Sequence, residues 1–156
     1  MAWRWLARSL FIFAPTVHWD HFYDYVAVPK HGRDIVAALL EQFSEYKIIF
    51  RPHPHTVDTP EVRKIAEAFK GYPQFEFDTN ASFYMENYAR SQLMITDMSG
   101  TAFTYAFTTS RPVVFFSHKV HNFRSFYKEQ SMVPVLELYW NRLFFSVKFI
   151  VDRYPP

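Results

Sequence analysis

Two short stretches of the chain combine residue types that bind phosphate. The first is Arg51-Pro52-His53-Pro54-His55, where two prolines restrict the backbone and so hold the cationic and imidazole side chains in place. A guanidinium offers a bidentate fork to phosphate oxygens, and an imidazole can donate to phosphate or protonate a leaving oxygen. The pattern therefore predicts substrate contacts through Arg51, His53 and His55. The alternative is a rigid turn whose histidines only cap a strand.

The second stretch is Asp97–Thr101, which lies between an apolar run and an amphipathic segment. Ser99 is a favoured helix N-cap residue, and Gly100 lets the backbone approach a ligand closely. The N–H groups of Gly100, Thr101 and Ala102, at the positive end of a helix dipole, would then bind an anion. An ordinary helix cap is the alternative. Together, the two stretches suggest a diphosphate held from both ends.

The histidines allow one further interpretation, which is a metal site. His53-x-His55, with His18, His21 or Asp97, could hold a divalent cation. Neither histidine pair has the i, i+4 spacing of a zinc protease, and no carboxylate cluster accompanies them, so we expect no metal and no cofactor. A Walker A loop, GxGxxG and GxSxG are absent, which disfavours P-loop NTPases, dinucleotide enzymes and α/β-hydrolases.

Apolar runs and helical periods alternate along the chain. Strands are predicted at Leu10–Ala14, Tyr46–Phe50, Gln74–Phe77, Leu93–Ile95 and Pro112–Ser117. Helices are predicted at Arg33–Phe43, Pro60–Gly71, Asn80–Arg90 and Asn122–Gln130, and after Gly100, where Phe103, Ala106 and Phe107 would face the sheet. This alternation predicts an α/β fold: a Rossmann-like, mostly parallel sheet with helices on both faces.

The connections in such a fold place the predicted ligand-binding residues together. Right-handed crossovers bring the loops that follow the strands to one rim. These loops are Pro15–His21, Arg51–His55, Asp78–Ser82, Asp97–Thr101 and Ser117–His121. Ligands bind at this rim in open α/β sheets, so the fold alone predicts a single site there.

Composition limits the class of protein. The 156 residues fit one domain, 1–156, with a core over about 10–130 and a C-terminal arm or helix over 131–156. The formal charge of +2 is too small to indicate a nucleic-acid partner. No stretch reaches the roughly 20 apolar residues of a membrane helix. The start, with Trp3, Trp5, Leu6 and two arginines, could contact a membrane surface peripherally.

Several motifs together resemble a known family. IFAPT (Ile12–Thr16), IIFRPHP (Ile48–Pro54), FDTN (Phe77–Asn80), SQLMITDMSGTAFTYAF (Ser91–Phe107) and RPVVFF (Arg111–Phe116) occur in the family's order. They resemble the C-terminal half of the CDP-glycerol glycerophosphotransferases, the teichoic-acid polymerase-like enzymes. That family has a GT-B fold, in which two Rossmann-like domains face a cleft and the C-terminal one holds most of the nucleotide.

The resemblance implies roles for individual residues. Arg51 and His53 would face the diphosphate, with His53 contacting the leaving group, and the Ser99–Thr101 loop would hold phosphate. Asp97 would orient the loop or the ribose. The reaction implied is attack of an acceptor hydroxyl on the distal phosphorus of a CDP-activated donor, with release of CMP.

The sequence also departs from the family pattern. Met98 and Gly100 stand where the family has tyrosine and serine, and Thr104 replaces an aspartate. The family's N-terminal domain, which carries the acceptor-side catalytic histidine, has no counterpart in this chain. The resemblance therefore implies a bacterial, cytoplasmic donor-binding domain whose partners are the CDP-activated donor, a polymer acceptor and that missing domain. A non-catalytic docking module that kept the fold but lost nucleotide binding is the alternative.

Overall fold

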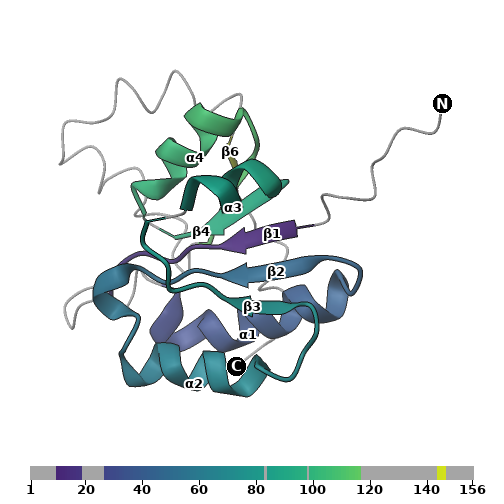
Figure 1. Cartoon of the computed structure of the whole chain (residues 1–156), viewed down its shortest axis with the longest axis vertical. Coiled ribbons are helices and arrows are strands. Elements are labelled where there is room, and N and C mark those ends of the chain that lie inside the picture. The colour runs from purple at the N-terminus through teal and green to yellow at the C-terminus, as the bar shows by residue number, and fades with distance from the viewer. Residues whose placement is uncertain (1–9, 19–26, 83, 98, 117–143, 147–156) are drawn as a thin grey trace.

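The computed structural model of the chain describes residues 10–18, 27–82, 84–97, 99–116 and 144–146 (Figure 1). The strands are β1 (Leu10–Phe13), β2 (Lys47–Phe50), β3 (Phe75–Phe77), β4 (Leu93–Thr96), β5 (Val113–Phe115) and β6 (Phe144–Ser146). The helices are α1 (Val28–Gln42), α2 (Pro60–Phe69), α3 (Tyr84–Arg90) and α4 (Thr101–Thr109), with a 3₁₀ turn at Pro54–Thr56. This order confirms the predicted α/β alternation.

The strands form one sheet in the order β3-β2-β1-β4-β5-β6, and every described pair is parallel. β1 and β4 are neighbours although two strands and three helices separate them in the sequence. From β1 to β3 the chain adds strands on one side of β1, and from β4 to β6 it adds them on the other side. The switch point of the sheet therefore lies between β1 and β4. In open α/β sheets, ligands bind in the crevice beyond the carboxyl ends of the strands at such a switch point.

Helices cover both faces of the sheet: α1 and α2 lie on one side, and α3 and α4 on the other (Figure 1). Because successive strand residues point to opposite faces, β1 contributes to two cores. Phe11 and Phe13 pack in the cluster that contains the buried residues of α1 and α2. Ile12 packs in the cluster with α3 and α4. Strands buried on both faces explain the continuous apolar runs of the sequence.

Helix α1 begins five residues before the predicted start at Arg33. Pro29 lies in its first turn, where the missing N–H has no helical partner to lose. Gly32 faces α2, since a Cβ at this position would lie 2.7 Å from Cδ1 of Ile65. The residues just before Arg33 therefore form the first turns of the helix, and Gly32 permits close packing between α1 and α2.

Two other predicted helices differ in detail from the structure. Helix α3 begins at Tyr84 because the Asn80 side chain accepts from the backbone N–H of Ser82 and forms a turn instead of a helix cap. In α4 the buried residues are Ala102, Tyr105 and Ala106, whereas Phe107 is 49% exposed. The prediction that Phe107 packs on the sheet was wrong, because the buried stripe begins one residue earlier.

Some expectations fall outside the described residues. They include the N-terminal aromatic segment, His21, the helix at Asn122–Gln130 and the 131–156 arm, of which only β6 is described. Within the described residues, none of the helices has the length and apolar character needed to cross a membrane.

Arg111 anchors the end of α3, the helix that flanks the rim. Its Nη1 donates to the carbonyl oxygens of Tyr88 at 3.0 Å and Ala89 at 2.9 Å, and also to that of Ser91. We expect Arg111→Ala to lower the free energy of unfolding by about 1–3 kcal/mol, because the carbonyl oxygens lose a charged donor. Arg90→Ala, on the exposed side of α3, is the control in urea denaturation. Equal losses in the two variants would contradict this assignment.

Candidate functional site

A pocket of about 410 Å³ lies at the carboxyl ends of β1, β2 and β4, at the switch point of the sheet. Its lining comprises Ala14, Pro15, Thr16, Arg51, Pro52, His53, Pro54, Ala81, Tyr84, Tyr88, Ser99, Gly100, Thr101 and Thr104. Five of the seven predicted substrate-binding residues are therefore brought together. The other two, His55 and Asp97, are not among the lining residues.

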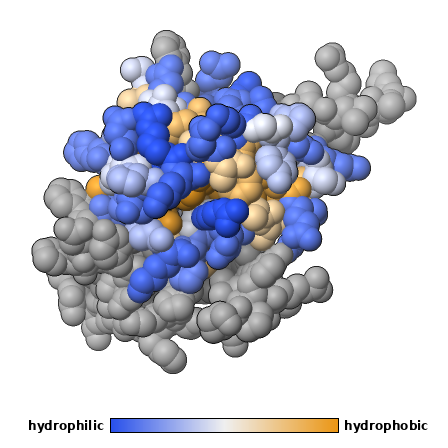
Figure 2. Space-filling view, turned by 90° about the horizontal axis from the view of Figure 1, so that it is seen from below, coloured by the Kyte–Doolittle hydropathy of each residue, from blue (hydrophilic) through white to orange (hydrophobic). Residues whose placement is uncertain are grey.

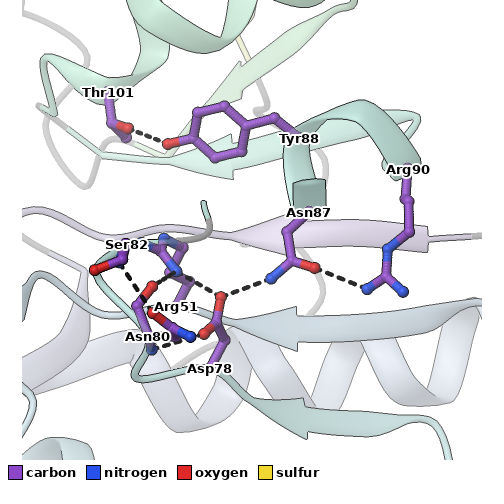
Figure 3. A network of polar contacts seen from close by, with 8 residues as sticks. All are labelled: Arg51, Asp78, Asn80, Ser82, Asn87, Tyr88, Arg90 and Thr101. Atoms are coloured by element: carbon purple, nitrogen blue, oxygen red, sulfur yellow. Dashed lines mark hydrogen bonds and ion pairs between the residues drawn. The ribbon is translucent and has the colours of Figure 1, made fainter. Parts of the chain in front are cut away.

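Arg51 lies at the pocket wall with its guanidinium already engaged. Nη1 donates to Oδ2 of Asp78 at 2.5 Å and to the carbonyl oxygen of Asn80 at 2.7 Å (Figure 3). The guanidinium carbon also lies 5.8 Å from the ring centre of Tyr84. The Arg51 side chain is 11% exposed. The structure thus pairs this arginine with a carboxylate, which the motif alone did not indicate.

His53 is held in a defined tautomer by its own loop. Its Nδ1 accepts the backbone N–H of His55 at 3.2 Å, so the neutral ring carries its proton on Nε2. Burial, together with the charge of His55, lowers the pKa of His53 below its usual 6.5. At neutral pH the ring is therefore uncharged and has an N–H donor on Nε2. His55 itself is exposed, and its ring lies 5.0 Å from that of His53.

The N-terminus of α4 has fewer free donors than predicted. Gly100, not Ser99, is the N-cap residue. The N–H of Ala102 donates to the carbonyl oxygen of Ser99 at 3.2 Å, and that of Thr101 lies 3.4 Å from Oγ of Ser99. The hydroxyl groups of Thr101 and Tyr88 are hydrogen-bonded to each other (Figure 3). Part of the predicted donor set is therefore already engaged within the protein.

Asp97 is completely buried below the rim. Its Oδ1 accepts from the backbone N–H of Thr16 at 2.7 Å, and its Oδ2 accepts from that of Ala27 at 2.8 Å. Burial raises the pKa of Asp97 to about 6, although both hydrogen bonds oppose the shift. The carboxylate thus fixes Thr16, which lines the pocket, and it positions the site from below.

Sequence reasoning missed the aromatic side of the pocket. Tyr84 and Tyr88 line it from α3, with ring centres 5.3 Å apart. Their i, i+4 spacing predicts a shared helix face, but not that this face borders the pocket. Thr104 of α4 also lines it.

The described residues contain no cluster of side chains that could act as metal ligands. In the described part of the chain, no three His, Asp or Glu side chains are placed to hold a metal ion. The ring of His18 lies at the start of α2, where Nε2 is 3.2 Å from Oγ1 of Thr59 and 3.8 Å from Glu61. Burial lowers the pKa of His18, and Glu61 opposes this shift.

A second hollow, of about 690 Å³, is lined by residues of α2 and β3. Figure 2 shows the side of the molecule nearest α2, where hydrophilic side chains surround a smaller hydrophobic patch. Two basic residues of the hollow, Arg63 and Lys70, are paired with Asp58 and Glu67. None of the predicted binding residues lies there, so the switch-point pocket is the candidate site.

The fold is that of an α/β domain of the kind found in GT-B transferases. Similar solved structures include a variant of the wall teichoic acid polymerase TagF, at 22% identity and a TM-score of 0.53, covering 75% of this chain. S. aureus MnaA with UDP is similar at 17% identity, a TM-score of 0.52 and 72% coverage. E. coli heptosyltransferase WaaC with ADP is similar at 17% identity, a TM-score of 0.51 and 69% coverage.

The chain belongs to the CDP-glycerol:poly(glycerophosphate) glycerophosphotransferase family, whose sequence model matches residues 6–135. It spans only part of the solved structures: 27% of the TagF chain, 29% of the MnaA chain and 33% of the WaaC chain. A search of curated proteins finds no match.

Proposed function

We propose that the switch-point pocket binds the diphosphate of a CDP-activated donor, CDP-glycerol or a related polyol phosphate or sugar. The observation that carries this proposal is the convergence of Arg51, His53 and Gly100 in one pocket of a domain of this family. The nucleoside diphosphates named for MnaA and WaaC, UDP and ADP, support it. The donor would serve transfer of phosphoglycerol to a hydroxyl of a cell-wall or surface polymer.

The chemistry of this transfer suits the groups in the pocket. An acceptor hydroxyl attacks the distal phosphorus, a new P–O bond forms, and the bond to the CMP oxygen breaks, leaving its electron pair on CMP. His53 Nε2–H donates to the phosphate oxygens, and Arg51 offsets their charge. In-line displacement depends mainly on such positioning and charge neutralisation.

The acceptor proton needs a base, which we assign to a second domain. The family's N-terminal half would supply it, so this chain alone would bind the donor without turning it over. We place the protein at the cytoplasmic side of a bacterial plasma membrane, with peripheral contact to its inner face.

His53→Ala tests the proposed site. Because hydrogen bonds to charged groups contribute about 1.5–3 kcal/mol, we expect the Kd for CDP to rise about tenfold to a hundredfold. His55→Ala is the matched control, since it removes an imidazole from the same loop but keeps the backbone N–H that His53 accepts. Calorimetric titration with CDP, UDP and CMP, with and without EDTA, measures the effect.

The outcomes separate the alternatives. Preference for CDP over UDP, insensitive to EDTA, would support the proposed donor, whereas preference for UDP would change it. Binding that EDTA abolishes would point to a metal. No nucleotide binding at millimolar concentration would contradict the proposal and favour the docking module.

A further inference from the structure

A buried carboxylate lies behind the wall of the pocket. Asp78 follows β3 and is 8% exposed. Its Oδ2 accepts from Nη1 of Arg51 at 2.5 Å and from Nδ2 of Asn87 at 2.7 Å, while its Oδ1 accepts the backbone N–H of Asn80 at 2.9 Å (Figure 3). Both carboxylate oxygens are therefore engaged, and Asp78 itself does not line the pocket.

These contacts join three segments around the site. Arg51 belongs to the loop after β2, Asn80 to the turn after β3, and Asn87 to α3. The same helix carries Tyr84, whose ring lies 5.8 Å from the Arg51 guanidinium carbon. The Asp78 carboxylate is thus the common acceptor that places the arginine against the tyrosine wall.

We propose that Asp78 is a positioning residue for donor binding, which fixes the Arg51 guanidinium at the pocket wall before the diphosphate arrives. This inference rests on the proposed function. A side chain that is already ordered loses less freedom when it binds, so the contact with phosphate is stronger. Asp78 also offsets part of the arginine's positive charge, and this effect weakens the contact with phosphate.

The burial of the pair decides which effect prevails. The side chains of Arg51 and Asp78 are only 11% and 7% exposed. Removing one partner of a buried ion pair leaves the other charge without compensation. Without the carboxylate, we expect the guanidinium to leave the wall for solvent, and phosphate affinity to fall.

Asp78→Asn in the full chain tests the proposal, because it removes the charge while keeping the shape. We expect the Kd for CDP to rise roughly tenfold, as for loss of a charged hydrogen bond. Weak binding of cytidine, which has no phosphate, should not change. Arg51→Gln should lose the same affinity, and adding Asp78→Asn to Arg51→Gln should cost no more. Asp78→Glu, which retains a carboxylate, should recover part of the loss.

Asp58→Asn is the matched control. It removes one acidic charge and the ion pair with Arg63, but at an exposed site just before the start of α2. CDP affinity should not change in this variant. Equal losses in the Asp58 and Asp78 variants would show a general charge effect and overturn the proposal. CDP binding in Asp78→Asn as tight as in the unmodified chain, or tighter, would overturn it too.

A second measurement needs no nucleotide. In ¹⁵N NMR, the Arg51 guanidinium should give a distinct, slowly exchanging Nη1–H signal, because Nη1 donates to Asp78. This signal should be lost in Asp78→Asn and kept in Asp58→Asn. If the unmodified chain binds no nucleotide, the proposed function fails, and this signal still decides whether Asp78 holds Arg51. An Arg51 signal unchanged in Asp78→Asn, with thermal unfolding confirming the fold, would overturn the inference.

Discussion

Gly100→Leu should abolish CDP binding while leaving the chain folded. Gly100 lines the pocket, and a Cβ built on it meets no atom within 4 Å. Its φ of −61° is accessible to any residue, so a side chain is not excluded by backbone strain. The leucine would instead extend into the space where the phosphate is proposed to bind. We expect at least about a hundredfold loss of affinity, corresponding to about 3 kcal/mol.

Gly71→Leu is the matched control for this substitution. A Cβ added to Gly71 likewise meets no atom within 4 Å, and its φ is not positive, but this residue follows α2, outside the pocket. Both variants should unfold within a few degrees of the unmodified chain, with Gly100→Leu less stable by about 1 kcal/mol because leucine is a poor N-cap. Full CDP affinity in Gly100→Leu would place the phosphate elsewhere.

The contribution of Asp97 to the stability of the chain should fall as pH rises from about 4 to 6. Its pKa is raised from 3.8 to about 6 by burial, so the native state holds a proton in this window that the unfolded chain has released. The linkage between pH and folding then makes the free energy of unfolding decrease with rising pH, by about 3 kcal/mol over the window.

Urea unfolding of the chain and of Asp97→Asn, at several pH values between about 3.5 and 7.5, measures this effect. The asparagine variant lacks the titrating group but shares all others, so the difference between the two curves isolates Asp97. The lowered pKa values of His18 and His53 act oppositely, making stability fall as pH drops below about 6.5, and they cancel in the difference. A difference that does not vary with pH would contradict the burial of a titrating carboxylate.

The order of strands and helices could be predicted from the sequence because it is a local property. Apolar runs such as Ile48–Phe50 are buried on both faces, and residues such as Pro52 and Pro60 interrupt or begin elements through their own backbone restrictions. Parallel connections then place the loops after the strands at one rim. The phosphate-binding types in two of these loops, Arg51–His55 and Asp97–Thr101, predicted the pocket's location for the same reason.

Tertiary structure alone decided what each of those side chains does. Asp97 points inward to Thr16 and Ala27, which are 81 and 70 residues away in sequence. Arg51 is paired with Asp78, 27 residues away, on the neighbouring strand's loop. A sequence pattern gives the period of an element, but the direction of a polar side chain depends on which distant donors and acceptors the sheet brings beside it.

The same distinction applies to helices α3 and α4. Their helical periodicity could be recognised in the sequence. Whether Tyr84 and Phe107 face the pocket, the core or solvent depends on how each helix is rotated as it packs on the sheet. Ala102 and Tyr105 fill the space above the strands, so Phe107 remains exposed. The sequence was sufficient to predict the α/β order and the rim that carries the proposed phosphate-binding residues. Packing across the sheet determined which of them became pocket wall, buried support or surface.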